Sequence, residues 1–484
     1  MSQLVASLAP LRGEDCCQFI DGEWVKGAGK RHVIVDKFTL QPFASVAEAS
    51  PAQLRQAVDV AQAAFAKGVP SGHNRGAILD RAAEGVAARQ EEFVQVMQHE
   101  AGFTRSDALG EIRRTVNTLR LSAEEARRLA GEMIPMDGVA GQSGRIAFTV
   151  RVPLGVVLAI TPFNAPLNTV THKVGPALAA GNAVVLKPSL HTPITAALLA
   201  QVLLDAGLPR GWLGVVHGGA EVVRALQEDE RIRFFAFTGS TEVGRVIQKQ
   251  AGLRRTQMEL GSIACTILCE DANLDAALPK VVGAAYRKAG QVCTSIQLLL
   301  VHESIAQEVE HKLAEHVRVL AYGDPSDAST VVGPVISEDA ARRIESWIEQ
   351  AIAGGARRLA GGPRKGAVVP PTLLAGIRDD MRVGCNEIFG PVMSIVPFCT
   401  LDEAIARVNA TPYGLATGVF TNRLPDALRA ARMLQVGGVH INETSSSRVD
   451  LMPYGGSKDS GFGREGPRYA VHEMTEERVV SMTT

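Results

Sequence analysis

Apolar and polar residues change their spacing near residue 145 of this 484-residue chain. Before that point apolar residues recur every three or four positions, which predicts helices over residues 51–68, 74–99 and 105–130. Ser50 is a good N-cap for the first helix. Residues 145–152 instead alternate, which predicts a half-buried strand. The apolar face of the first helix would consist of Leu54, Ala57, Val58, Ala61 and Ala64, and that of the strand of Ile146, Phe148, Val150 and Val152.

From residue 153 onward, short apolar runs alternate with helical segments. Strands that are apolar on both faces and alternate with helices indicate a parallel sheet covered on both sides. A second series of the same kind is predicted from about residue 258 to residue 442, so the predicted fold class is α/β with two parallel sheets. The C-terminal residues 477–484 predict an edge strand that is open to pairing with a partner. The strands predicted first are 153–160, 183–187, 213–217 and 234–238, followed in the second series by 265–269 and 298–301; the helices are 167–180, 192–206, 220–227, 241–252, 274–289 and 305–320.

Composition narrows the class of protein. A length of 484 residues allows about three domains, and 46% apolar with 21% charged residues is typical of globular chains. The formal net charge of −1 provides no electrostatic reason to expect nucleic acid or an anionic membrane as a partner. We find neither an apolar run long enough to span a membrane nor a secretory signal, and we expect a cytoplasmic protein. Seven cysteines without a CxxC motif favour neither a disulfide framework nor a metal site.

Three residues are candidates for chemistry, and each also has an ordinary structural explanation. Cys293 has small neighbours that leave a nucleophilic sulfur accessible, although most cysteines are buried and inert. Glu259 lies in a mostly apolar stretch, where burial would raise its pKa toward acid–base work near neutrality; otherwise it is a carboxylate on a surface turn. Asn164 stands between two prolines at a strand end, where its amide would suit an oxyanion or simply a turn.

Residues 461–466 match the dinucleotide pattern G-x-G-x-x-G, but no strand precedes them and the chain ends too soon afterwards. We therefore predict a glycine-rich surface turn there. Residues 237–244 are a better candidate cofactor site, because they follow an apolar strand and open a helix whose free N–H groups suit pyrophosphate; the alternative is an ordinary capped turn between strand and helix. Lys187 ends a buried strand, where it would point into the ligand crevice of a parallel sheet or into solvent.

Taken together, several motifs occur in a fixed order. They are Thr161-Pro-Phe-Asn164, Gly181-Asn-Ala-Val-Val-Leu-Lys187-Pro-Ser189, Phe237-Thr-Gly-Ser-Thr-Glu-Val-Gly244, Glu259-Leu-Gly261, Gly290-Gln-Val-Cys293, Glu387-Ile-Phe389-Gly-Pro391, Pro453-Tyr-Gly-Gly456 and Ser460-Gly461. With these motifs the chain resembles the aldehyde dehydrogenase superfamily over essentially its whole length.

The resemblance implies a domain organisation. A Rossmann-type cofactor domain would comprise residues 1–132 and 153–258, and a catalytic domain residues 259–442. Residues 133–152 and 477–484 would form a β oligomerisation arm, and residues 443–476 a loop segment that lines the substrate entrance. Since family members usually assemble through such an arm, we expect a homodimer or a homotetramer.

The resemblance also implies site residues. Cys293 would be the nucleophile, Glu259 the general base and Asn164 the oxyanion donor. The cofactor, NAD or NADP, would be bound by Thr161, Pro162, Phe163, Lys187, Ser189, Gly219, Gly239, Ser240, Val243, Leu260, Glu387 and Phe389. The small aldehyde substrate would contact Arg114, His172, Thr294 and Arg448. The implied reaction oxidises an aldehyde to a carboxylic acid through a thiohemiacetal and a thioester on cysteine, and the presence of Glu259 argues for hydrolysis rather than transfer to coenzyme A.

Departures from the family pattern concern cofactor and substrate. Ser262 replaces a usual glycine, which could shift the loop near Glu259. Leu190 replaces a glutamate common in NAD-preferring members, so we predict that NADP is accepted as well. Arg114 and Arg448 would form a fork for an anionic tail, as in phosphonoacetaldehyde, a sulfo-aldehyde or a semialdehyde. If both arginines are solvated instead, neutral or aromatic aldehydes are the alternative. A cysteine hydrolase and a non-enzymatic protein on the same fold remain rival hypotheses.

Overall fold

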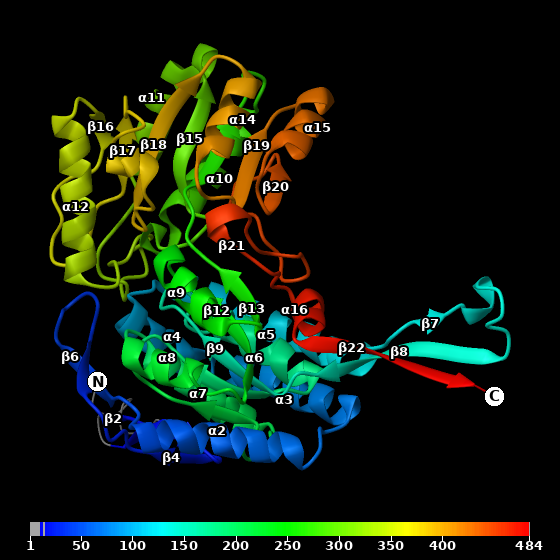
Figure 1. The fold of residues 1–484 in the computed structure, drawn as a ribbon. Coiled ribbons are helices and arrows are strands. Elements are labelled where there is room, and N and C mark those ends of the chain that lie inside the picture. The colour runs from blue at the N-terminus through cyan, green and yellow to red at the C-terminus, as the bar shows by residue number, and fades with distance from the viewer. Residues whose placement is uncertain (1–9, 13–14, 484) are drawn as a thin grey trace.

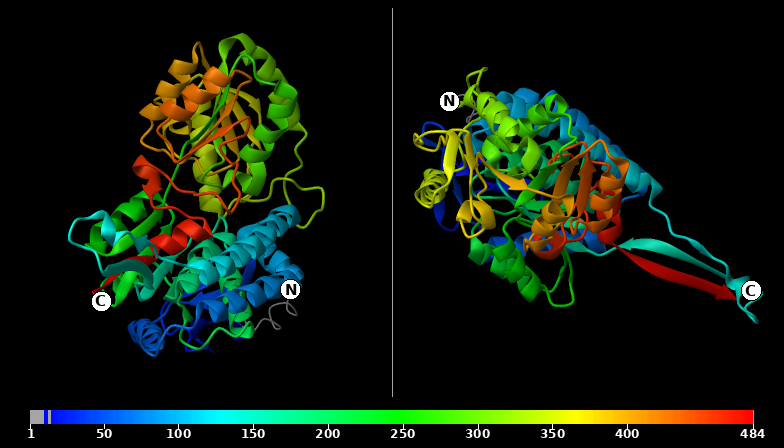
Figure 2. Two further views of the ribbon diagram at one scale, coloured as in Figure 1. Left: turned by 90° about the vertical axis from the view of Figure 1, so that its right-hand side faces the viewer. Right: turned by 90° about the horizontal axis from the view of Figure 1, so that it is seen from above.

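The structure is a computed structural model that describes residues 10–12 and 15–483. It has two lobes, each built on a sheet covered by helices, and a slender arm that carries the C-terminal strand away from both (Figure 1). Figure 2 shows the arm extending well beyond the body of the chain. None of the helices in the described residues combines the length and the apolar character needed to cross a membrane.

The first lobe contains an eight-stranded sheet of order β21-β13-β12-β9-β10-β11-β3-β4. Its five strands from β13 to β11 are parallel, and their carboxyl ends therefore meet at one edge. The strands are β3 (Gln18–Ile20), β4 (Glu23–Val25), β9 (Val156–Ile160), β10 (Ala183–Lys187), β11 (Leu213–Val215), β12 (Ile232–Thr238), β13 (Arg255–Glu259) and β21 (Gly461–Phe462). The helices of this lobe are α2 (Pro51–Ala66), α3 (Gly72–Ala88), α4 (Gln90–Ala101), α5 (Arg105–Arg128), α6 (Asn168–Ala180), α7 (Pro193–Asp205), α8 (Ala220–Gln227), α9 (Thr241–Ala251) and α16 (Pro467–Glu473).

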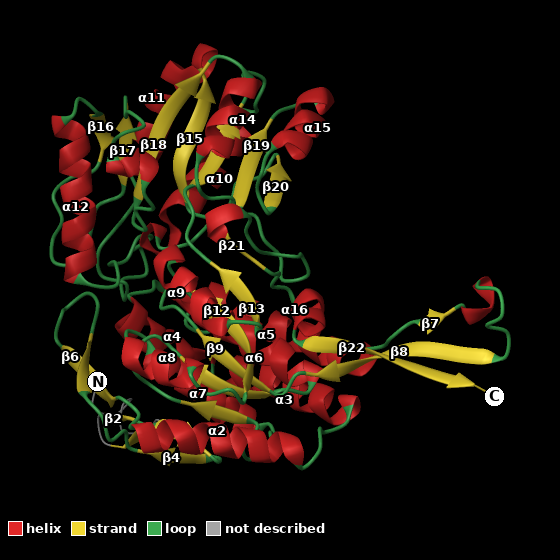
Figure 3. Ribbon diagram, viewed as in Figure 1, coloured by secondary structure: helices red, strands yellow, loops and turns green. Residues whose placement is uncertain are grey.

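The second lobe contains a seven-stranded sheet of order β16-β17-β18-β15-β14-β19-β20, parallel except for β16. Figure 3 shows helices on both sides of this sheet. Its strands are β14 (Ala264–Leu268), β15 (Ile296–His302), β16 (Arg357–Ala360), β17 (Thr372–Ala375), β18 (Val392–Phe398), β19 (Ala416–Phe420) and β20 (Gly438–Ile441). Its helices are α10 (Leu274–Tyr286), α11 (Ala306–Arg318), α12 (Glu338–Ala353), α13 (Arg382–Cys385), α14 (Leu401–Ala410) and α15 (Leu424–Met433).

Two smaller sheets complete the described chain. The arm is a three-stranded antiparallel sheet of order β22-β8-β7, formed by β7 (Met133–Ile134), β8 (Arg145–Pro153) and β22 (Thr475–Thr483). A four-stranded sheet of order β1-β2-β6-β5 lies near the N-terminus, formed by β1 (Leu11–Arg12), β2 (Asp15–Cys16), β5 (Arg31–Val35) and β6 (Pro42–Ala47). Short 3₁₀ turns are η1 (Met136–Gly138), η2 (Arg287–Gly290), η3 (Glu303–Ile305) and η4 (Lys458–Ser460).

Local sequence signals predicted most of the elements in the first lobe. The Ser50 side chain accepts a hydrogen bond from the backbone of Gln53, and the side chain of Gln53 binds back to Ser50, which makes a full capping box for α2. The predicted inner face of this helix is buried at all five positions. The single helix predicted over residues 74–99 is wrong, because the chain forms two helices, α3 and α4, that separate at Arg89.

The boundary predicted near residue 258 falls within a strand of the first sheet that was not predicted. Arg255–Glu259 forms β13, which pairs in parallel with β12 and belongs to the first sheet. Its sequence, Arg-Thr-Gln-Met-Glu, has no apolar run, so the pattern did not reveal a strand. The second sheet begins at Ala264.

The strand predicted over residues 145–152 is present as β8, but its apolar face is not buried within a single chain. Ile146 remains 43% exposed, whereas its neighbour Ala147 is 2% exposed. Val479 and Met482 of the paired strand β22 are exposed as well. The arm therefore presents apolar side chains that no part of its own described chain covers.

Candidate active site

Cys293 lies three residues before the start of β15, in a tight connection from α10. Lys288 and Ala289 in this connection have left-handed backbone angles, with φ of 51° and 53°. Gly290 follows at φ 67°, and a Cβ there would stand 2.1 Å from the carbonyl oxygen of Gly390. This close backbone approach requires glycine and fixes the position of Cys293 three residues later.

Two cavities meet at Cys293. One has a volume of about 270 Å³ and lies toward the carboxyl edge of the first sheet. The other has a volume of about 50 Å³ and extends toward α5 and loop 443–452. Both are lined by Asn164, Thr238, Glu259 and Cys293. A molecule in either cavity would therefore contact the same thiol, and the structure brings together the three residues predicted for the chemistry.

Tyr454 connects the thiol with the carboxylate. Its hydroxyl lies 2.9 Å from the sulfur of Cys293 and donates to Oε1 of Glu259 at 3.2 Å. Glu259 ends β13 and is only 4% exposed, so it is not a surface carboxylate. Burial, and after it the charge of Glu465, raises the pKa of Glu259 to about 7. Burial, and then the nearby Glu259 carboxylate, raises the pKa of the Cys293 thiol well above its usual value.

The larger cavity is lined by seven of the residues predicted to bind the cofactor: Pro162, Phe163, Gly239, Ser240, Leu260, Glu387 and Phe389. Ser240 caps the N-terminus of α9. The Phe163 and Phe389 rings meet edge to face, with centroids 5.8 Å apart. Glu387 accepts the backbone N–H of Ser262 at 2.9 Å, so this serine is accommodated beside it. A Cβ on Gly261 would come within 2.7 Å of the same carboxylate, which keeps this part of the cavity open.

The other five predicted cofactor residues lie outside the lining of that cavity. They are Thr161, Lys187, Ser189, Gly219 and Val243, and they follow the carboxyl ends of β9, β10, β11 and β12 along the same edge of the sheet. Burial lowers the pKa of Lys187 to about 8. The hydroxyl of Thr161 is buried and has no hydrogen-bond partner among the described residues. An unpaired buried donor, a capped helix N-terminus and a row of strand ends suit an elongated polar ligand such as a dinucleotide.

On the substrate side, three of the four predicted residues line the smaller cavity, namely Arg114, Thr294 and Arg448. His172 does not: it is 1% exposed and lies behind Arg448, with its Nε2 3.1 Å from the guanidinium. Both predicted arginines already have carboxylate partners. Arg114 binds Asp450 at 2.8 Å, and Arg448 binds Glu465 at 2.8 Å. The two guanidinium groups are therefore not free to form the predicted fork. Arg448 is also largely buried, so it is not a solvated surface group.

Arg287 is a cation of this cavity that the sequence reasoning missed. It lines the cavity and donates to the hydroxyl of Ser446 at 3.2 Å. Among the described residues it has no carboxylate within ion-pairing distance. Burial, and then the positive charge of Arg114, lowers the pKa of Arg287. Its place six positions before Cys293, in the same connection, is the signal that could have identified it.

The prediction that residues 461–466 form a surface turn is wrong. Gly461 pairs with Glu259 in an antiparallel bridge, and a Cβ on Gly461 would stand 2.2 Å from the carbonyl oxygen of Met258. Glu465 is 2% exposed and binds Lys173 as well as Arg448, each at 2.8 Å. The three glycines of this stretch all have positive φ, so the chain can fold back against β13, and a two-residue strand leaves no readable pattern.

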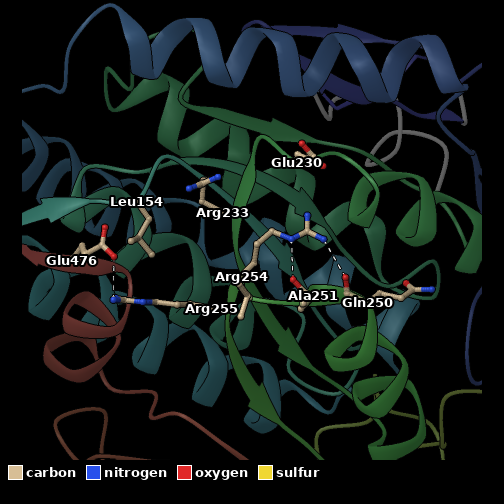
Figure 4. A pocket seen from close by; sticks show the side chains of 10 residues that line it. Leu154, Glu230, Arg233, Gln250, Ala251, Arg254, Arg255 and Glu476 are labelled. Carbon is tan, nitrogen blue, oxygen red and sulfur yellow. Dashed lines mark hydrogen bonds and ion pairs between the residues drawn. The ribbon is translucent and has the colours of Figure 1, made fainter.

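A hollow larger than these two cavities, of about 590 Å³, lies elsewhere, between the end of α9 and the base of the arm (Figure 4). Arg254 donates to backbone carbonyls there, and Arg255 pairs with Glu476. None of the predicted site residues lines it. The chemistry of the site is therefore assigned to the two cavities at Cys293.

Comparison with known proteins agrees with this geometry. The profile of the "Aldehyde dehydrogenase family" matches residues 24–480. The 3-sulfolactaldehyde dehydrogenase of Priestia megaterium is 45% identical over 463 residues, which cover 96% of this chain and 97% of that protein. The solved structure of aldehyde dehydrogenase 21 from Physcomitrella patens, in complex with the reaction product succinate, has a TM-score of 0.94 at 36% identity and covers 98% of this chain and 99% of that one. NADP-dependent glyceraldehyde-3-phosphate dehydrogenase from Bacillus halodurans, complexed with NADP, has a TM-score of 0.94 at 34% identity, with 96% and 99% covered.

Fold and site thus define an oxidoreductase that oxidises aldehydes with a nicotinamide cofactor. The chain belongs to the aldehyde dehydrogenase family. The resemblance seen in the sequence, the α/β fold class and NAD or NADP as cofactor are confirmed.

Proposed function

We propose that this enzyme oxidises a short aldehyde with an anionic tail to the carboxylic acid, with NAD or NADP as oxidant and water as acyl acceptor. The observation that carries the proposal is Arg287, a guanidinium in the substrate cavity without a carboxylate partner among the described residues. The hydroxyls of Ser446 and Thr294 lie beside it, 3.0 Å from each other. A sulfonate, carboxylate or phosphate would find charge and hydrogen-bond donors there.

The three relatives described above support this substrate class by their names. One is named for sulfolactaldehyde, one was solved with succinate and one is named for glyceraldehyde 3-phosphate. All three molecules carry an acidic group. The lining of the cavity also argues against aromatic aldehydes, since Tyr454 is the sole aromatic side chain in the part of the lining that the structure describes.

In the proposed mechanism the thiolate of Cys293 attacks the aldehyde carbon and forms a thiohemiacetal. The side-chain amide of Asn164 and the backbone N–H of Cys293 stabilise the oxyanion; loss of one such donor typically costs about 10²–10³ in rate. Lys288 binds the carbonyl oxygen of Asn164 at 3.2 Å and so helps to orient this loop. Bound NAD(P)⁺ supplies the hydride acceptor. Oxidation leaves a thioester on Cys293.

Glu259 is proposed to activate the water that hydrolyses this thioester. It lines both cavities, and its pKa of about 7 lets it exchange protons near neutral pH. The residues along the edge of the first sheet would hold the cofactor, with Lys187 and Glu387 at ribose hydroxyls and Ser240 at the pyrophosphate. Leu190 places no carboxylate beside Lys187, which favours acceptance of NADP besides NAD.

We also propose that the arm mediates self-association into a dimer or a tetramer. β22 is an edge strand whose outer side has no partner strand in the described chain, and apolar side chains are exposed along it. Sedimentation analysis of the purified chain tests this: a monomer at micromolar concentration would contradict it.

The experiment that tests the proposed substrate class is an aldehyde panel read at the absorbance of reduced nicotinamide. Sulfolactaldehyde, succinate semialdehyde and phosphonoacetaldehyde are compared with neutral aldehydes of equal length, each with NAD and with NADP. We expect kcat/KM to favour the anionic members by at least about tenfold. Equal values for both groups would overturn the anionic-tail proposal, and thiol-dependent ester hydrolysis without any aldehyde oxidation would favour the hydrolase alternative.

A further inference from the structure

Cys293, Tyr454 and Glu259 form a continuous hydrogen-bonded chain in the centre of the site. The Tyr454 hydroxyl is 2.9 Å from the thiol sulfur and 3.2 Å from Oε1 of Glu259. One hydroxyl that accepts from one neighbour and donates to the other is the arrangement through which a proton can pass in either direction. Nothing in the roles assigned above requires this tyrosine.

Contacts of its ring and of its backbone hold the phenol in this position. Its ring lies under the guanidinium of Arg448, whose central carbon is 3.7 Å from the ring centroid. Arg448 is in turn held by Glu465 at 2.8 Å. The backbone of Tyr454 exchanges two hydrogen bonds with that of Glu465, at 3.1 Å and 2.6 Å. The hydroxyl therefore has little freedom to leave the thiol and the carboxylate.

The thiol needs such a route. Burial raises the pKa of the Cys293 thiol well above its usual value, so few thiolates would form by loss of a proton to water. The base that supplies the alternative is Glu259, which lies close to the sulfur and shares the hydroxyl of Tyr454 with it. Glu259 is suited to receive the proton, because burial raises its pKa to about 7 and so stabilises its neutral form near neutral pH.

We propose that Tyr454 is a catalytic residue whose hydroxyl relays the proton of the Cys293 thiol to Glu259 before the sulfur attacks the aldehyde. The S–H bond of Cys293 breaks as its proton binds Oη of Tyr454. The proton already on Oη moves to Oε1 of Glu259. Thiolate, neutral tyrosine and neutral glutamic acid result, so one negative charge has moved from carboxylate to sulfur, and no oxidant is required. The relay rests on the proposed role of Cys293 as nucleophile.

The test measures alkylation of Cys293 by iodoacetamide in the whole enzyme across pH, with peptide mapping to separate Cys293 from the other cysteines. This readout does not depend on aldehyde turnover. Four proteins form a double-mutant cycle: wild type, Tyr454→Phe, Glu259→Gln and the combination. Tyr322→Phe serves as the matched control, because this tyrosine is 51% exposed and lies outside both cavities. Circular dichroism confirms that each variant is folded.

We expect Tyr454→Phe to lower the alkylation rate near pH 7 by at least about tenfold, within the range of general acid–base effects. Glu259→Gln should lower the wild-type rate similarly but change the rate of Tyr454→Phe by less than about twofold, because the path through the hydroxyl of Tyr454, which the proposal makes the operative one, is already broken. The relay is overturned if Tyr454→Phe keeps more than about a tenth of the wild-type rate. It is also overturned if adding Glu259→Gln to Tyr454→Phe lowers the rate of that variant by more than about twofold. The latter result would mean direct transfer from thiol to carboxylate.

If Cys293 of the wild type is not alkylated at all, the nucleophile assignment fails together with the relay. If Cys293 is alkylated at a rate that does not depend on Tyr454, the relay alone fails.

Discussion

Replacing Arg287 by glutamine removes the cation that we expect to bind the anionic end of the substrate. Glutamine keeps a polar side chain of similar reach and can still contact the hydroxyl of Ser446, which Arg287 binds at 3.2 Å. Since Arg287 has no carboxylate partner among the described residues, its loss leaves no buried acid without a counter-charge. The variant should therefore fold, and its effect should fall on binding.

The magnitude follows from the type of contact that is lost. Hydrogen bonds to charged groups contribute about 1.5–3 kcal/mol, more than those between neutral groups. Since about 1.4 kcal/mol corresponds to a factor of ten, kcat/KM for an anionic aldehyde should fall by about 10- to 150-fold. A neutral aldehyde makes no such contact and should lose less than about threefold.

The assay compares succinate semialdehyde with a neutral aldehyde of equal length, with wild type and Arg287→Gln. Arg113→Gln is the matched control, because Arg113 is an exposed arginine of α5 that does not line the substrate cavity. Arg114→Ala and Arg448→Ala are less selective probes, since each would remove one of the partners of a buried carboxylate, Asp450 or Glu465. An equal loss on both substrates in Arg287→Gln would refute the reasoning.

Four further predictions concern individual residues and the choice of cofactor. Because Glu259 has a pKa of about 7 and acts as a base only when ionised, kcat should fall as the pH drops below about 7; a pH-independent kcat between about pH 5.5 and 8 would contradict its role. Leu190→Glu should lower the NADP/NAD ratio of kcat/KM at least about tenfold, since the new carboxylate would repel a 2′-phosphate near Lys187; an unchanged ratio argues against this location. In the wild type, an NADP efficiency more than about a thousandfold below that for NAD would refute dual acceptance. Lys288→Met should cost about 3–5 kcal/mol in urea unfolding, because it leaves the buried carboxylate of Glu111 without its ion pair; a loss below about 1 kcal/mol would contradict this pairing.

Local signals in the chain determined much of the fold. Helix α2, with its Ser50 cap and its inner face, depends on interactions within a few residues, and these can be read directly. The apolar strands β9 and β10 are readable for the same reason, since burial on both faces leaves a continuous run. Strand β13 escaped detection because one buried methionine among polar residues carries no periodic signal.

For the site, the ordered motifs determined by themselves the family and the three candidate residues Cys293, Glu259 and Asn164. Only the tertiary structure decided which side chains surround them. Tyr454 is 161 positions from Cys293 and 195 from Glu259, yet it contacts both. The tertiary structure also decided that Arg448 has a carboxylate partner while Arg287, among the described residues, has none. The physical reason is that charge pairing and hydrogen bonding depend on distances of a few ångströms across separate sheets and loops, and no local spacing in the chain encodes those distances.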